Sequence, residues 1–338
     1  MSAASEPLRR AAAQGIHRLA IPTPFRVGRV NAYLIEDDPL TLIDSGPNSE
    51  KSLAELEQGL AAHGHAVEDL RLLVITHQHI DHSGLAGVLA ARSGAEVAAL
   101  AALAPLLEHY DEYAELEDRF AGQAMLRHGI PADMNAGLQA VSASFRGWGA
   151  AVSVTRPLSD GDALALRDRT LRVLHRPGHS PSDTVFHDES RALLLAGDHL
   201  IAHISSNPLM ARPLEASADA DPERPQALVA YLESLERTRE MDLDLVLSGH
   251  GEPVTDHATL IDERFRQHRR RAEKIHGLIR ERPRNAHEIA LALWGDIAVT
   301  QAYLTLSEVL GHVDLLVNAG RVGEVEGPDG TVQFAPLD

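Results

Sequence analysis

The sequence predicts an α/β protein with a helical insertion and a small C-terminal domain. Between residues 16 and 100, short apolar runs typical of strands alternate with segments of helical spacing. From 101 to 149 the strand-like runs stop, and helix-like segments with scattered aromatic residues replace them. After residue 282, two helix-like segments precede two strand-like runs, which is the outline of a winged helix.

The first part of the chain alternates between strand and helix patterns. Helices are expected at 49–63, where Leu53, Leu56 and Leu60 form one apolar stripe, and at 84–91. Strands are expected where short apolar runs end at turn residues, namely at 16–21, 30–36, 40–44, 70–75 and 96–100.

The second part repeats this alternation and then ends in a compact tail. Its expected strands are 170–175, 184–187, 191–196 and 244–247, and its expected helices are 222–240 and 260–282. In the tail, helices are expected at 286–294 and 301–319, and strands at 321–326 and 331–334, joined by a turn at Pro328-Asp329-Gly330. We therefore expect two domains, one over 16–282 that contains the insertion 101–149, and one over 283–338.

Composition narrows the function. The 338 residues include 31 Lys and Arg against 49 Asp and Glu, a net charge of −18, which disfavours nucleic acid as a partner because phosphate binding needs a basic face. There is no cysteine, so disulfides, thiolate metal sites and a cysteine nucleophile are excluded. The strong metal ligands that remain are carboxylates and 19 histidines.

Neither a secretory signal nor a membrane span is expected. The first 15 residues lack an apolar core, and the most apolar stretch, 97–107, contains Pro105 and is too short to cross a bilayer. A cytoplasmic protein is the resulting expectation.

Candidate ligands for metal ions follow four expected strands. An apolar strand that ends in a turn is a rigid support for such ligands, and a glycine there lets the chain pass close to a metal. The candidates are His77, His79, Asp81 and His82 in one segment, then His179 after Pro177-Gly178, Asp198 after Gly197, and His250 after Gly249.

The segment from His77 to His82 has the spacing to serve two metal ions. In an extended chain His77 and His79 lie on one side, and the turn into the next helix brings Asp81 and His82 towards a second point. Imidazole and carboxylate ligands without sulfur suit two divalent ions, with zinc favoured and iron or manganese as alternatives.

The sequence Thr-His-Gln-His-Ile-Asp-His-Ser-Gly at 76–84 resembles the signature of the metallo-β-lactamase superfamily. Asp44 and the later motifs around His179, Asp198 and His250 stand in the order of that family, over roughly residues 16–260. The resemblance implies an αββα metallo-β-lactamase sandwich with a binuclear metal site at one edge of the sheets.

The resemblance also implies a role for each residue. The first metal would be held by His77, His79 and His179. The second would be held by Asp81, His82 and His250, with Asp198 bridging the two. Asp44 would orient ligands by hydrogen bonds. The set is similar to the glyoxalase II-like branch and departs from the best-known β-lactamase subclass, whose cysteine ligand is missing here.

The implied mechanism is attack by a metal-bridging hydroxide on a carbonyl or phosphoryl centre. In it, Asp81 and Asp198 are the catalytic carboxylates, and Asp81 would orient the nucleophile. The proton donor to the leaving group is open: His199 and His203 are candidates, and both are also interpretable as surface or structural histidines.

Three further features have two interpretations each. The insertion would cap the substrate pocket, or provide extra packing or a homodimer surface. The basic run from Arg264 to Lys274 would be a solvated helix face or a site for an anionic group such as a coenzyme A phosphate. The tail resembles the small C-terminal domain of one hydrolase branch, and Trp294 and Tyr303 would pack in its core or reach the substrate.

The favoured function is a metal-dependent hydrolase that cuts a small-molecule thioester or carboxylic ester, either glyoxalase II-like or an acyl-CoA thioesterase. A lactonase is the first alternative, because the same centre would open lactones. A phosphodiesterase or ribonuclease is the second, and the acidic charge weighs against it. The alternative from another class is a non-catalytic binding protein with a vestigial site.

Overall fold

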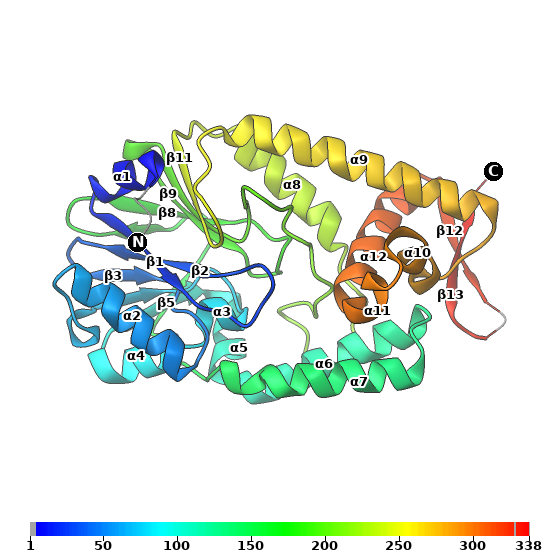
Figure 1. Ribbon diagram of the computed structural model, residues 1–338, viewed down its shortest axis with the longest axis horizontal. Helices are drawn as coiled ribbons and strands as arrows, with labels where there is room; N and C mark the ends of the chain where they lie inside the picture. Colours follow the sequence, from blue (N-terminus) through cyan, green and yellow to red (C-terminus); the bar gives the residue numbers. More distant parts are fainter. Residues whose placement is uncertain (1–4, 328, 338) are drawn as a thin grey trace.

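The computed structural model describes residues 5–327 and 329–337. Two β-sheets face each other at one end of the molecule, and a group of helices with a small hairpin forms the other end (Figure 1). In the described residues the strands form sheets of six, five and two members. The α/β class and the sandwich expected from the sequence are confirmed.

The six-stranded sheet follows the order of the chain. Its first three strands pair antiparallel, and its last four pair parallel. The strands are β1 (Ile16–Ile21), β2 (Val30–Ile35), β3 (Thr41–Ile43), β4 (Leu72–Val74), β5 (Glu96–Leu100) and β6 (Arg156–Leu158).

The five-stranded sheet has the order β11-β10-β9-β8-β7, and only β10 and β11 pair parallel. Its strands are β7 (Ala163–Ala165), β8 (Thr170–His175), β9 (Thr184–Asp188), β10 (Leu193–Gly197) and β11 (Leu245–Ser248).

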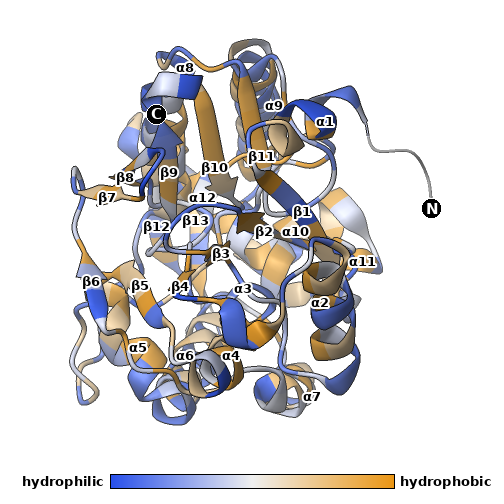
Figure 2. Cartoon of the chain, turned by 90° about the vertical axis from the view of Figure 1, so that its left-hand side faces the viewer, coloured by the Kyte–Doolittle hydropathy of each residue, from blue (hydrophilic) through white to orange (hydrophobic). Residues whose placement is uncertain are grey.

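Side-chain alternation along the strands explains why helices cover both outer faces. On β10, Leu193 and Leu195 belong to the core between the two sheets, whereas Leu194 and Ala196 belong to the core under the outer helices. Successive side chains of a strand point to opposite faces, so an unbroken apolar run requires cover on both sides. Figure 2 shows β9, β10 and β11 as mostly hydrophobic.

The outer layers are helical. Helices α2 (Glu50–Ala62) and α4 (Ala86–Ser93) cover the first sheet, and α8 (Ala227–Arg239) and α9 (His257–Glu281) cover the second. Ser49 begins α2 by accepting a hydrogen bond from the backbone of Ser52, as helix N-caps do. The remaining elements of this part are α1 (Glu6–Ala12), α3 (Ile80–Ser83), η1 (Val67–Asp69) and η4 (Glu189–Arg191).

The insertion is helical, as expected. It contains η2 (Ala101–Leu103), α5 (Ala104–Glu108), α6 (Tyr110–Arg127), α7 (Ala132–Phe145) and η3 (Arg146–Trp148). The helices α6 and α7 run along the lower side of Figure 1, from the sandwich towards the tail.

The tail consists of α10 (Ala286–Trp294), α11 (Ile297–Thr300), α12 (Ala302–Asn318) and the antiparallel pair β12 (Val322–Glu326) and β13 (Val332–Pro336). Its core is continuous with the insertion and with α9, because Phe120 of α6 and Ile275 of α9 share one apolar cluster with Leu310 of α12.

Helix α9 joins the two ends of the molecule. It is 25 residues long and crosses the upper side of Figure 1 from the sandwich to the tail. Its buried residues follow the 3.6-residue period of a helix. They are His257, Ile261, Arg264, His268, Ala272, Ile275 and Ile279.

The structure differs from the sequence-based expectation in a few elements. The helix expected from residue 222 begins only at Ala227, and α1, β6 and β7 were not expected. The hairpin of the tail is present, but Pro328 of its expected turn lies outside the described residues. The winged-helix comparison and the domain boundaries stay predictions. No helix in the described part of the chain has the length and apolar surface needed to cross a membrane.

Candidate metal centre

The seven side chains expected to bind metal lie together at one end of the sandwich. They lie in the segments that follow β4, β8, β10 and β11. They form three overlapping groups of potential metal ligands: His77, His79 and His179; His77, His82 and Asp198; and Asp81, His82 and His250.

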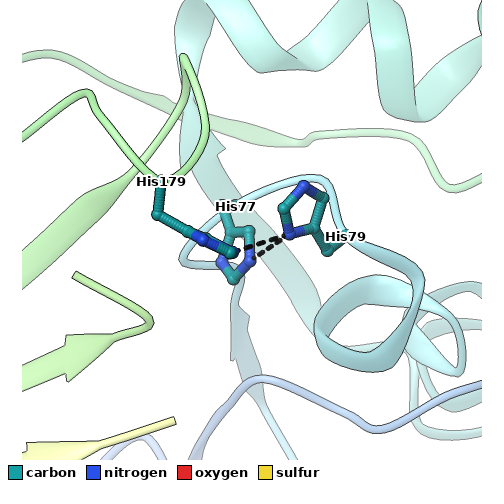
Figure 3. Close-up of side chains that lie close together, drawn as sticks. All are labelled: His77, His79 and His179. Carbon is teal, nitrogen blue, oxygen red and sulfur yellow. Dashed lines mark hydrogen bonds between the residues drawn. The ribbon is translucent and has the colours of Figure 1, made fainter. Parts of the chain in front are cut away.

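The first group consists of three histidines. Nδ1 of His79 lies 3.0 Å from Nε2 of His77 and 3.0 Å from Nε2 of His179. Figure 3 shows the three rings turned towards one another, with His179 reaching in from a different loop. Three nitrogens that converge in this way are a donor set for one transition-metal ion.

A second set of potential ligands, Asp81, His82 and His250, lies next to the three histidines. Nε2 of His250 lies 3.3 Å from Oδ2 of Asp81 and 3.5 Å from Oδ2 of Asp198, and Nε2 of His82 lies 3.4 Å from Oδ1 of Asp198. Oδ2 of Asp198 is also 3.6 Å from Nε2 of His179. The carboxylate of Asp198 therefore lies between the two groups.

Asp44 and Thr76 fix the orientation of two imidazoles. Asp44 follows β3, and its Oδ2 accepts hydrogen bonds from Nδ1 of His82 at 2.8 Å and from the Thr76 hydroxyl at 2.9 Å. That hydroxyl in turn lies 2.9 Å from Nδ1 of His77. With Nδ1 engaged as a donor on the outer side, Nε2 of His77 and of His82 is the ring atom that faces the centre, where it would present its lone pair to a metal ion.

Two backbone carbonyls orient the other imidazoles in the same way. Nδ1 of His250 donates to the carbonyl of Arg29 at 2.9 Å, and Nδ1 of His179 donates to the carbonyl of Asn207 at 3.0 Å. The positioning roles of Thr76, Arg29 and Asn207 were not expected from the sequence. The position of Thr76 just before His77 was the only signal, because a backbone carbonyl has no residue-type signature.

Charge and burial act against each other in the centre. Burial lowers the pKa of His79 to about 3, so this imidazole is neutral at pH 7. Burial alone would raise the pKa of Asp198, but the imidazoles of His82 and His250 outweigh it and hold that pKa well below its ordinary value. Asp198 is therefore an anion at neutral pH.

Three buried atoms of the centre support its fit to metal ions. Nε2 of His82, Oδ1 of Asp198 and Nε2 of His250 are buried without a hydrogen-bond partner. Burial of unpaired polar atoms is costly, and a cation at their centre would satisfy all three. The backbone of Gly249 passes close to Asp198. A Cβ at this position would lie 2.3 Å from Oδ1 of Asp198, so only glycine fits there.

The sequence pattern of the Metallo-beta-lactamase superfamily matches residues 25–250, which contain all seven residues of the centre. The chain belongs to this superfamily.

Relatives within the superfamily include enzymes. The chain is 33% identical over 301 residues to the "Probable metallo-hydrolase YqjP" of Bacillus subtilis, covering 88% of this chain and 91% of that protein. It is 32% identical over 183 residues to the human "Acyl-coenzyme A thioesterase MBLAC2", covering 50% of this chain and 58% of the human protein. The protein is a metal-dependent hydrolase of the superfamily.

Two solved structures of the superfamily share nearly the whole fold. The protein TTHA1429 of Thermus thermophilus has 26% identity and a TM-score of 0.80, over 96% of this chain and 99% of that one. A beta-lactamase domain protein of Burkholderia ambifaria has 28% identity and a TM-score of 0.80, over 96% of this chain and 92% of that one.

The two candidate proton donors have different surroundings. His199 is fully buried, its Nε2 lies 2.8 Å from the hydroxyl of Thr238 on α8, and burial lowers its pKa to about 3. These contacts make His199 a neutral packing residue. His203 is exposed, and its ring lies over Gly251, the residue after His250.

The basic run at 264–274 is not one continuous surface. Arg264 is buried, and its Nη2 donates to the carbonyls of Ile201, Ala202 and Ile204. Neither interpretation of the run fits this residue, because it clamps the loop after Asp198. The exposed arginines of the run are Arg266, Arg269 and Arg270.

Trp294 and Tyr303, expected either to pack in the tail core or to reach the substrate, have packing contacts. The guanidinium carbon of Arg271 lies over the ring of Trp294, 5.0 Å from the ring centre. Tyr303 donates its hydroxyl hydrogen to the carbonyl of Met210. Both belong to the periphery of the tail core, and Phe120 of the insertion is buried in it.

Proposed function

We propose that the protein is a binuclear metallohydrolase that cleaves the thioester bond of an acyl-CoA. The observation that carries the metal part is that ligand atoms of His82, Asp198 and His250 are buried and unpaired, although carboxylate oxygens of Asp198 lie 3.4 Å from Nε2 of His82 and 3.5 Å from Nε2 of His250. The substrate part rests on the likeness to proteins named as acyl-coenzyme A thioesterases.

In this proposal His77, His79 and His179 would hold the first ion. Asp81, His82 and His250 would hold the second. Asp198 would serve both, which its distances of 3.6 Å to His179 and 3.5 Å to His250 support. The all-nitrogen and oxygen donor set suits zinc, with iron or manganese as alternatives.

The bound ions would supply an activated water molecule at neutral pH and would polarise the substrate carbonyl. The chain's own residues provide orientation. Asp81, 3.3 Å from Nε2 of His250, would accept a hydrogen bond from the attacking water and so aim it at the carbonyl carbon. Asp44 keeps His82 in the tautomer that binds metal.

His203 is the proposed proton donor to the leaving group. It is exposed and lies next to Gly251, the residue after the proposed ligand His250, whereas His199 is engaged with Thr238. A His203→Gln variant should keep its metal content and lose turnover mainly for esters with poorer leaving groups than a thiolate, because a thiolate departs with little need for a proton. An equal loss for both classes would exclude this role.

The test of the whole proposal is a panel of substrates offered to the metal-loaded protein and to Asp198→Asn. The panel contains acyl-CoA esters, S-lactoylglutathione, homoserine lactones and a phosphodiester. Acyl-CoA should have the highest kcat/KM, and Asp198→Asn should lower it by more than about a hundredfold with an unchanged circular dichroism spectrum.

Lactone opening is the second candidate, because the same centre would attack a cyclic ester. A higher kcat/KM for homoserine lactones than for acyl-CoA would replace the thioesterase proposal by this one. Fewer than one bound metal ion per chain after native purification would contradict the binuclear centre itself.

A further inference from the structure

A second group of metal-ligating side chains lies away from the centre described above, where α9 packs against α12. It consists of His268 on α9 with Glu308 and His312 on α12, and we name these three residues the interhelical cluster. One ligand atom from each residue lies within 4.8 Å of the others. The two imidazoles are buried, and the Glu308 side chain is 19% exposed, which leaves a path from solvent.

The nitrogens of the interhelical cluster point at one another. Nδ1 of His312 lies 2.7 Å from the carbonyl oxygen of Glu308 and donates to it, so its Nε2 keeps the lone pair. That Nε2 lies 3.2 Å from Nδ1 of His268. On the other side of the His268 ring, Nε2 lies 3.3 Å from the hydroxyl oxygen of Ser205, which can accept a hydrogen bond from this nitrogen.

With those outer hydrogen bonds in place, two lone pairs face each other at 3.2 Å, and a positive charge is needed between them. A metal ion meets this need, and so does a hydrogen on Nδ1 of His268 if Ser205 donates instead of accepting. Burial lowers the pKa of both imidazoles to about 4, so both are neutral at pH 7, as metal ligands must be.

Glu308 is the third potential ligand of the cluster, and Oε1 of its carboxylate lies 3.8 Å from Nδ1 of His312. Nη1 of Arg271 lies 3.3 Å from its Oε1, which holds the carboxylate beside the two imidazoles and leaves acceptor positions unused. Two imidazoles and one carboxylate are a common ligand set for zinc. We propose that the interhelical cluster is an additional metal site, which binds one zinc-like divalent cation.

Such an ion would join three parts of the chain. Its ligands belong to α9 and α12, and Ser205 comes from the loop after β10, where the neighbouring Ser206 donates to the carbonyl of Asp198. The ion would therefore hold the tail against the loop that follows a ligand of the hydrolytic centre. The inference does not depend on the proposed substrate or on turnover.

Metal content of the full-length protein tests the proposal. Wild type, Glu308→Gln and His268→Gln are loaded with zinc, equilibrated at a buffered micromolar zinc concentration, and counted by elemental analysis and native mass spectrometry. Wild type should hold one zinc ion per chain more than either variant. Glu308→Gln keeps the shape of the side chain, so it remains informative if His268→Gln fails to fold.

Two controls separate this site from the hydrolytic centre. His276→Gln changes a histidine on α9 that contacts Arg321 instead, and it should keep the full count. Asp198→Asn should lose zinc from the hydrolytic centre and keep the additional ion. With cobalt in place of zinc, the visible absorption lost in Glu308→Gln should remain in Asp198→Asn. Equal metal content in wild type and Glu308→Gln would refute the site and leave a neutral hydrogen-bonded histidine pair.

Discussion

Asp44 occupies a left-handed backbone conformation, with φ of 58°, where β3 ends. Few residues other than glycine adopt this conformation, and aspartate is one that tolerates it. The turn aims the carboxylate at the backbone and hydroxyl of Thr76 and at Nδ1 of His82, all of which donate to it. A buried carboxylate that meets only donors cannot be replaced by an amide without a conflict.

We expect Asp44→Asn to weaken metal binding by about 10- to 100-fold. The amide would present hydrogens to Thr76 or His82, where the carboxylate accepts them, and would release the ring of His82. Competition with a chromophoric zinc chelator measures the change. Asp168→Asn, in the turn before β8, is the matched control, and an unchanged affinity in Asp44→Asn would contradict the orienting role.

The raised pKa of Glu117 on α6 should make the folding stability depend on pH. Burial raises its pKa to about 7, although the Tyr113 hydroxyl and the backbone N–H of Arg212 donate to it and oppose the shift. Between pH 4.5 and 7 the unfolded chain loses this proton while the folded chain keeps it. Folding stability from this group is therefore complete below pH 4.5 and falls as pH rises towards 7.

Glu117→Gln should remove that loss, because glutamine has no proton to release and its oxygen can still accept both hydrogen bonds. The free energy of unfolding of the variant relative to wild type should increase from pH 5 to pH 8, by up to about 3 kcal/mol. Urea unfolding at several pH values measures it, and a constant difference across this range would show that Glu117 has an ordinary pKa.

At the residue scale, the sequence predicts the residues that converge and one residue that orients them, Asp44, but not the backbone carbonyls that orient His179 and His250. The histidines and aspartates at strand ends form local motifs, and all seven lie together in the structure. Asn207 and Arg29 act through carbonyl groups, which every residue has, and they become partners of His179 and His250 only through the tertiary fold.

At the scale of elements, segments that lie in a periodic or continuous apolar run were predictable, and short segments outside such a run were not. Helix α2 and strands β1, β5 and β8 have the expected positions within one residue. Strands β6 and β7 have three residues each and lie in no longer apolar run, whereas β3 and β4, which are equally short, lie within the apolar runs at 40–44 and 70–75. Helix α8 begins later than expected, at Ala227, because Pro225 restricts the residue before it and disfavours a helix there.

The loop between β10 and α8 depends on helix α12. The side-chain amide of Asn207 donates to the carbonyl of Leu304 at 3.0 Å, and the backbone N–H of Met210 donates to the hydroxyl of Ser307 at 3.2 Å. The same Asn207 offers its carbonyl to His179. Helix α12 thus supports the loop that orients one of the proposed ligands.

Asn207→Ala should lower the affinity for the first metal ion by about tenfold, because the loop loses its bond to α12 while its backbone carbonyl remains. Zinc competition on the purified variant measures this change. Gln226→Ala removes a contact with Asn318 at the other end of α12 and is the control. Equal affinities for both variants would mean that α12 does not support the centre.

At the scale of the whole molecule, the sequence suggested two domains, and the cores suggest one cooperative unit. The tail core includes Phe120 and Met125 of the insertion together with Ile275 and Ile279 of α9. Helix α9 also contributes Ile261 to the core under the second sheet. Such sharing depends on long-range packing, which no local pattern in the chain reveals.

We therefore expect a single unfolding transition in calorimetry. Leu310→Ala, at a fully buried position of α12, should lower the free energy of unfolding by about 2–5 kcal/mol and shift the whole transition. Leu337→Ala, at a side chain that is 54% exposed, should have little effect. Two separate transitions, with only one moved by Leu310→Ala, would show that the tail unfolds independently.

Helix α9 also constrains how the chain can change in length. Ile261 packs under the second sheet, and Ile275 packs in the tail, on one face of a single rigid rod. One residue inserted between them, beside the exposed Arg269, would rotate the distal half by about 100° and advance it by about 1.5 Å. The side chains before and after the insertion would then no longer lie on the same face of α9, although the contacts within the sandwich and within the tail would be unchanged. Even an insertion of seven residues, which restores the angular register, would move the tail by about 10 Å and break the bonds of α12 to the loop after β10. The length of α9 between Ile261 and Ile275 should therefore tolerate neither insertions nor deletions.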